Sequence, residues 1–223
     1  MAKLVWDQPG EKLWETGVDR AVLFPMTNGS HGEGVAWSGI TAINESPSGA
    51  EPSKIYADNI VYGVVMSPEE DGITIEAFTY PDEFCQCIGE AELGAGVTVK
   101  QQNHEHFGLA YRTLIGNDED GSKHGYKLHL FYDCVAGSSE DSNSTINDSP
   151  EQKTFSWSVT TIPVPITNTD GEVIADPASS IVIDSTKVTS AKLQAIEDLL
   201  YGTASASSSL PSPAAIKAIL DAA

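Results

Sequence analysis

The 223-residue chain has few basic residues and no long apolar run. Only 12 Lys and Arg stand against 32 Asp and Glu, which gives a formal net charge of −20. Because proteins bind nucleic acids mainly by neutralising phosphates with Lys and Arg, this balance argues against ordinary DNA or RNA binding. A membrane helix needs about 18 consecutive apolar residues, and the amino-terminal segment also lacks the apolar stretch of a signal peptide. We therefore expect a protein that has no membrane partner and that stays in the cytoplasm or leaves it by a route without a signal peptide.

Cysteine is also scarce, and its odd number of three fits reduced thiols better than a disulfide framework. Cys85 and Cys87 are one residue apart, as are His104 and His106, so two extended strands could present all four side chains to one metal ion. A strand separates the two sulfurs by about 7 Å, which is too wide for one ion. We expect residues 81–90 to continue a strand that carries ordinary thiols, with no metal bound.

Signatures of catalysis are missing as well. The chain contains no nucleophile elbow, no phosphate-binding loop and no dinucleotide-binding fingerprint. The turn sequence GNDEDG resembles a calcium loop, but Gly116 and Lys127 fall where oxygen ligands are required. We expect no enzymatic activity and no cofactor.

Most of the remaining sequence alternates with period two, which is typical of half-buried strands. The expected strands are residues 34–43, 59–66, 72–80, 96–103, 107–115, 126–132, 154–162 and 179–185, and an unbroken run from the fourth into the fifth is left open. Residues 107–115 and 126–132 flank a polar turn and predict a hairpin. Residues 46–53 and 137–150 are expected to be loops.

Two amphipathic helices are predicted near the carboxyl end of the chain. An apolar stripe over residues 188–202 predicts a helix that ends at Gly202 and packs on the sheet. A Ser/Ala linker follows, and a shorter helix then begins near Pro213. We expect a main domain over residues 1–202 and a linker with a short helix over residues 203–223.

Five stretches, in their order and spacing, resemble one family, and they cover nearly the whole chain. They are WSGITAINESPSGAEPSKIYADNIVY, ITIEAFTYPDEF, FGLAYRTLIGND, TINDSPEQKTFSWSVTT and SIVIDSTKVTSAKLQAIEDLLYGT. Together they resemble the major tail protein, or tail tube protein, of bacteriophages with long non-contractile tails. The resemblance runs from about Lys3 to Gly202 and includes the later LPSP motif.

The resemblance implies a mainly β fold: a β-sandwich or partly open barrel with one flanking α-helix and a short C-terminal helix. It also implies homo-hexameric rings that stack into a tube, which conducts the phage genome into the host. The tube would be assembled in the host cytoplasm and lie in the virion tail with tape measure, tail terminator and distal tail proteins. DNA would pass through without specific binding, and a surplus of carboxylates would repel it over about 8 Å at physiological salt.

In this family a long loop and a terminal arm reach between rings. Here the loop best matches residues 40–60, in which Glu45, Glu51, Lys54 and Tyr56 are candidate inter-ring contacts.

Three alternatives remain open from the sequence. The chain could be the tube protein of a related secretion or injection system. It could also be a β-sandwich ligand-binding module, in which some of its four tryptophans stack on a sugar: Trp6, Trp14, Trp37 and Trp157. A metal-dependent hydrolase would instead require bound zinc with converging His and carboxylate side chains.

Overall fold

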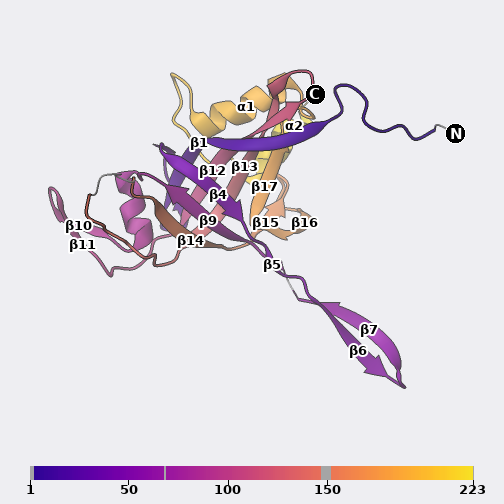
Figure 1. The fold of residues 1–223 in the computed structure, drawn as a ribbon, viewed down its shortest axis with the longest axis horizontal. Coiled ribbons are helices and arrows are strands. Elements are labelled where there is room, and N and C mark those ends of the chain that lie inside the picture. The colour runs from indigo at the N-terminus through magenta and orange to yellow at the C-terminus, as the bar shows by residue number, and fades with distance from the viewer. Residues whose placement is uncertain (1–2, 68, 147–151, 223) are drawn as a thin grey trace.

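The computed structural model describes residues 3–67, 69–146 and 152–222 (Figure 1). The strands are β1 (Leu13–Thr27), β2 (Ser30–His31), β3 (Val35–Trp37), β4 (Ile40–Glu45), β5 (Ser48–Gly49), β6 (Pro52–Ala57), β7 (Ile60–Met66), β8 (Glu69–Glu70), β9 (Gly72–Ala77), β10 (Ala91–Gly94), β11 (Val97–Val99), β12 (Phe107–Asn117), β13 (Gly121–Ala136), β14 (Phe155–Thr161), β15 (Val164–Thr167), β16 (Val173–Ala178) and β17 (Ser180–Asp184). The helices are the 3₁₀ helix η1 (Asp82–Ile88), α1 (Ser190–Tyr201) and α2 (Pro213–Asp221).

One large antiparallel sheet forms the body of the protein, as the predicted mainly β class requires. Its strand order is β2-β1-β12-β13-β14-β9-β4, and β17 and β3 pair with β13 and β1. The predicted hairpin is confirmed as β12 and β13, in which Leu109 faces Phe131 and Ile115 faces Gly125. In the described residues, four two-stranded ladders lie outside this sheet: β5–β8, β6–β7, β10–β11 and β15–β16.

An aromatic cluster fills one side of this sheet. Trp157 alternates with exposed serines on β14, as the sequence predicted, and it packs against Phe84 and Trp37 at centroid distances of 5.2 and 5.8 Å. Each of the strands β1, β3, β9, β12, β13 and β14 contributes at least one buried residue to this cluster. Strands from both ends of the sheet order therefore share one core, which requires the sheet to curl around it. Among the described residues, β4 pairs with β9 and with no other strand, so the curl stays open.

The helices cover a second apolar cluster on the opposite side of the same strands. Val22 and Phe24 of β1 belong to it, whereas Ala21 and Leu23 belong to the aromatic cluster. Helix α1 contributes its buried Leu193, Ile196 and Leu200, and these pack with Leu128, Leu130 and Ile183 of the sheet. The predicted helix is thus confirmed in position and in its packing on the sheet.

The short carboxyl-terminal helix α2 also packs on its own subunit. Ile216 is 4% exposed and belongs to the helix-side cluster, together with Leu210 before the helix. The hydroxyl of Tyr132 donates to the Pro211 carbonyl oxygen at 3.1 Å, and Lys192 donates to the Leu220 carbonyl oxygen at 2.8 Å. These contacts connect the end of the chain to β13 and α1.

The predicted strand over residues 81–90 is wrong, because η1 occupies residues 82–88. Pro81 has no amide hydrogen for a sheet ladder, and it precedes two acidic residues that suit the first turn of a helix. The turn places Phe84 in the aromatic cluster, where its ring lies 4.5 Å from that of Trp37. Gly89, at φ 75°, then ends the helix. Burial of Phe84 therefore outweighs the local alternation.

Other boundaries also differ from the sequence expectations. Residues 46–53 are not a continuous loop, since β5 and the start of β6 lie within them. The strand expected at 96–103 ends at Val99, and the chain between Val99 and Phe107 forms no strand, so it does not run unbroken into β12. Residues 137–146 contain no helix or strand, and the rest of the predicted loop at 147–150 lies outside the described residues.

Candidate assembly surface

The most prominent surface feature is a long hairpin that extends away from the body. Strands β6 and β7 pair from Pro52↔Met66 to Ala57↔Ile60, and the two-residue ladder β5–β8 connects them to the sheet. Figure 1 shows this hairpin as an arm well clear of the body. We call residues 52–66 the arm.

A tight turn closes the tip of the arm. Asp58 and Asn59 both have positive φ, at 50° and 64°, and they connect paired residues Ala57 and Ile60. Two consecutive residues of positive φ define a type I′ turn, whose twist matches that of the flanking strands. The arm is therefore a hairpin with a tight turn, and its ladder has one register shift, between Ile55 and Tyr56.

The arm exposes apolar side chains on both of its faces. Only Ala57 and Gly63 of its residues are even partly covered. Tyr62 is 76% exposed and Tyr56 is 65% exposed. The exposed large apolar residues of the arm are Ile55, Tyr56, Ile60, Val61, Tyr62, Val64, Val65 and Met66. An isolated two-stranded hairpin is marginally stable in water, and exposed apolar strand edges promote association. This surface is therefore suited to burial against another molecule.

Charge distinguishes the arm from the rest of the chain. The arm contains one lysine, Lys54, and one acid, Asp58, so its formal charge is zero. The formal charge of −20 therefore comes entirely from residues outside the arm. A neutral apolar arm can approach a second acidic copy without the repulsion that two acidic surfaces would experience.

The amino-terminal segment is a second extended feature with exposed apolar residues. Leu4, Val5 and Trp6 are 73%, 62% and 72% exposed, and residues 3–12 form no helix or strand. Figure 1 shows this segment leading away from the body. It is attached near Gly10, whose amide donates to Asp118 in the β12–β13 turn at 3.0 Å.

The four predicted contact residues do not share one environment. Glu51 directly precedes the arm, and Lys54 and Tyr56 lie on β6, all three exposed. Glu45 is instead the last residue of β4, on the body. The predicted contact residues did not include Tyr62, Val64 and Val65. The sequence does carry a signal for them, because the run IVYGVVM is apolar at consecutive positions, which would place apolar side chains on both faces of a strand.

Glu45 contacts two aromatic residues of its own subunit. Its Oε1 atom accepts a hydrogen bond from the Tyr111 hydroxyl and lies 3.1 Å from Nδ1 of His129. The Glu45 Oε1 and His129 Nδ1 atoms are within ion-pair distance, but their angles do not fit a hydrogen bond. Within the described chain, the buried Nδ1 atom of His129 therefore has no hydrogen-bond partner. Nε2 of the same ring lies 3.1 Å from the Thr113 hydroxyl.

These contacts change the acid–base properties of the group. His129 and then Tyr111 hold the pKa of Glu45 below its ordinary value, in opposition to partial burial, which raises it. Burial and the Glu45 carboxylate both raise the pKa of Tyr111. Glu45 therefore stays ionised and Tyr111 stays protonated around neutral pH, as the hydrogen bond between them requires.

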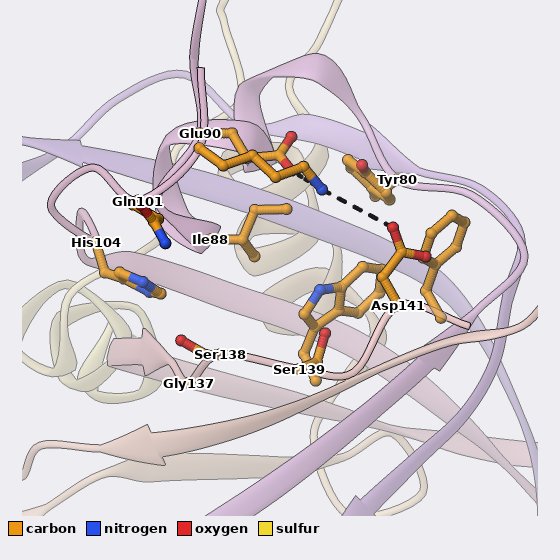
Figure 2. Close-up of a pocket in the computed structure, with 12 residues that line it drawn as sticks. Tyr80, Ile88, Glu90, Gln101, His104, Gly137, Ser138, Ser139 and Asp141 are labelled. Atoms are coloured by element: carbon orange, nitrogen blue, oxygen red, sulfur yellow. Dashed lines mark ion pairs between the residues drawn. The ribbon is translucent and has the colours of Figure 1, made fainter. Parts of the chain in front are cut away.

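A pocket of about 290 Å³ lies beside η1 (Figure 2). Lys100 spans its rim, 3.0 Å from Glu90 and 3.8 Å from Asp141. Tyr80, Phe155 and Trp157 contribute aromatic carbon to its lining. Trp157 is 2% exposed, so its ring does not offer the open face that stacking on a sugar requires. The ion pairs at the rim satisfy charges within the subunit.

The cysteines and histidines that could have formed a metal site have other partners. Cys87 is buried, and burial raises the pKa of its thiol to about 12. Nδ1 of His104 lies 2.7 Å from the Ala136 carbonyl oxygen, and Nδ1 of His106 lies 2.6 Å from Asp133. In the part of the chain that the structure describes, no three His, Cys, Asp or Glu residues are grouped to hold a metal ion.

No family model matches the chain, and no curated protein matches it. Among the residues that the structure describes, no helix is long and apolar enough to span a membrane.

Proposed function

We propose that this chain is a structural subunit of a bacteriophage tail tube, in which hexameric rings stack into a conduit for the genome. The observation that carries the proposal is the arm: a hairpin held away from the body, neutral in charge and apolar on both faces. In the tube, the arm of one subunit buries its apolar residues against a subunit of the next ring. The tube then lies in the virion tail and is assembled in the host cytoplasm.

The fold of the body supports a structural role. A large antiparallel sheet is buried on one side by its own curl and on the other by helices, so the subunit is folded before it assembles. The arm contributes no residue to either buried cluster. Its apolar surface is therefore available for contacts between subunits, and its loss would not remove any core residue.

The charge of the chain supports a conduit for DNA. A wall rich in carboxylates repels DNA phosphates within about one Debye length, roughly 8 Å at physiological salt. The formal charge of −20 provides many such groups. The five sequence stretches that resemble tail tube proteins point to the same role. Tape measure, tail terminator and distal tail proteins are the partners that this role implies.

Electron microscopy of the purified full-length chain tests the proposal. We expect tubes of uniform width whose end views show six-fold rings. A chain that remains monomeric over a wide range of concentrations would contradict the proposal. A tube protein of a secretion or injection system would also form rings. Detection of the protein in phage particles distinguishes a tail tube protein from that alternative.

A matched pair of variants tests the role of the arm. Val64→Asp places a charge on an arm residue that is 54% exposed, and Val173→Asp makes the same change at a 72% exposed valine of β16. Burial of one valine side chain stabilises a contact by about 1.5 to 3 kcal/mol, and a buried unpaired charge opposes it further. We expect Val64→Asp to abolish tubes and Val173→Asp to retain them. Tubes from the Val64→Asp variant would contradict burial of the arm.

A further inference from the structure

Glu45 occupies the position at which the body ends and the connection to the arm begins. It pairs with Ile73 at the end of the β4–β9 ladder, and the Ser46 amide then donates to the Gly72 carbonyl oxygen at 2.7 Å. Beyond this point, only the exposed two-residue ladder β5–β8 precedes the arm in the described chain. The orientation of the arm therefore depends on how firmly the end of β4 is held.

We propose that the Glu45 carboxylate acts as a positioning residue that fixes the root of the arm by binding Tyr111 and His129. This inference rests on the proposed function, because it assigns a role in directing the arm toward the next subunit. Within its own subunit the Oε1 atom already faces two groups of the chain, and contact of Glu45 with the next ring stays a separate prediction.

The partners of Glu45 form a rigid platform. Tyr111 is 2% exposed and His129 is 9% exposed, and their rings stack at a centroid distance of 4.6 Å and an interplanar angle of 6°. The ring of Phe131 is nearly parallel to that of Tyr111, at a centroid distance of 6.2 Å and an interplanar angle of 9°. The rings project from β12 and β13, the paired strands that form the long central hairpin of the sheet. A group bound to this platform has little freedom to move.

The contact also joins strands that are not neighbours. In the sheet order, β13 and β4 are separated by β14 and β9. Glu45 therefore reaches across the inside of the curl to the central strands β12 and β13, to which no ladder hydrogen bonds link β4 in the described residues. A bridge at this point restrains β4 in a direction that its ladder to β9 does not. Without it, the end of β4 and the attached arm can swing as a unit.

A distance measurement on the monomer tests this role directly. One spin label is placed on the arm by Tyr62→Cys and a second on α1 by Ala191→Cys, both at exposed sites, in a Cys85→Ser background. Cys87 and Cys134 are buried and should not react under native conditions. Pulsed electron paramagnetic resonance then reports the distribution of distances between arm and body. We expect one narrow distribution for this parent.

Two variants and a matched control complete the experiment. Glu45→Ala and Tyr111→Phe each remove one side of the contact, and both should lose the single narrow distribution. The control is Tyr126→Phe, because Tyr126 also donates its hydroxyl to a glutamate, Glu197 at 2.8 Å, but on the helix side. The control should retain the narrow distribution. An unchanged distribution in Glu45→Ala or Tyr111→Phe would overturn the proposal.

The same variants separate this inference from the proposed function. If the unlabelled native chain forms tubes and both variants keep a narrow distance distribution, the positioning role fails alone. If the native chain forms no tubes but the variants broaden the distribution, the tail tube proposal fails while the effect of Glu45 on the arm stands. If the tail tube proposal and the positioning role of Glu45 both hold, Glu45→Ala should raise the protein concentration at which tubes first appear.

Discussion

Replacement of Ile216 tests whether the last helix stabilises its own subunit. Ile216 is 4% exposed and lies in the helix-side cluster with Leu210 and residues of α1. Truncation of a buried isoleucine to alanine costs about 2 to 5 kcal/mol, because it removes apolar contacts and leaves a cavity. A folded domain has a total stability of about 5 to 15 kcal/mol. We therefore expect Ile216→Ala to remove a large part of the stability of the monomer.

The expected loss of stability in Ile216→Ala requires that α2 is helical because it packs on the body, and not by itself. A helix of nine residues is marginal in water without tertiary contacts. Alanine has the higher intrinsic helix propensity, so the substitution does not weaken the helix itself. Any loss of stability therefore measures the contact between Ile216 and the body.

Urea unfolding of the dilute monomer, followed by tryptophan fluorescence, provides the assay. Leu220→Ala, at a residue that is 39% exposed, is the matched control and should cost about 1 kcal/mol or less. In a thermal scan, Ile216→Ala should lower Tm by roughly 4 to 20 °C for a chain of this size. Equal and small effects of the two variants would refute docking of α2 on its own subunit, and would place its partner on another molecule.

Two further predictions concern the surface of the body and the thiols. Asp19 accepts two hydrogen bonds from Arg112, at 2.6 and 2.7 Å, which lower the pKa of Asp19. The stability from this pair is thus present above about pH 4 and is lost as the pH falls through the lowered pKa. Arg112→Lys should cost about 1 kcal/mol or less at pH 7 in urea unfolding, given the exposure of Asp19, and the difference from wild type should vanish at about pH 2. Alkylation of the native protein, followed by mass spectrometry, should modify Cys85 before Cys87 and Cys134. The last two thiols are buried and have raised pKa values. Equal alkylation rates at all three cysteines would contradict the packing around η1.

The sequence predicted those strands whose two faces have different surroundings. On β14, Trp157 and Val159 are buried while the intervening residues are exposed, so the alternation is visible in the sequence. The pairing of β12 with β13 was also predictable, because a polar turn joins two apolar segments. The helix at α1 followed from its apolar stripe. These elements have local signals.

Strand β1 was not predicted, because its surroundings hide the alternation. Four consecutive residues of this strand are buried, on alternate sides of the sheet: Ala21, Val22, Leu23 and Phe24. A strand that is covered on both faces has no polar side, so its period-two pattern disappears. The first half of β1 is mostly exposed and mixes polar with apolar residues, which conceals it further. The length of this strand could be known only from its pairing with β12.

The position of Glu45 was beyond sequence reasoning for a different reason. Its partners Tyr111 and His129 lie 66 and 84 residues further along the chain and approach it only when the sheet curls. A charged residue beside a loop resembles a surface contact when its tertiary partners are unknown. The apolar residues of β7, in contrast, are a local feature and were assigned to a strand from the sequence, whereas Ile55 and Tyr56 of β6 were placed in a long loop.

Separation of the arm from the buried clusters would let one chain fold alone and also assemble into the proposed tail tube. The body buries both faces of its main sheet within the subunit, so its stability does not require a partner. The arm adds nothing to that core, and its exposed apolar residues lower the free energy only when another molecule covers them. Substitutions on the arm should therefore alter assembly with little effect on unfolding, whereas substitutions such as Ile216→Ala should do the reverse. Substitution of Glu45 falls between these two classes, because its side chain contacts residues of the body whereas its proposed effect is on the orientation of the arm.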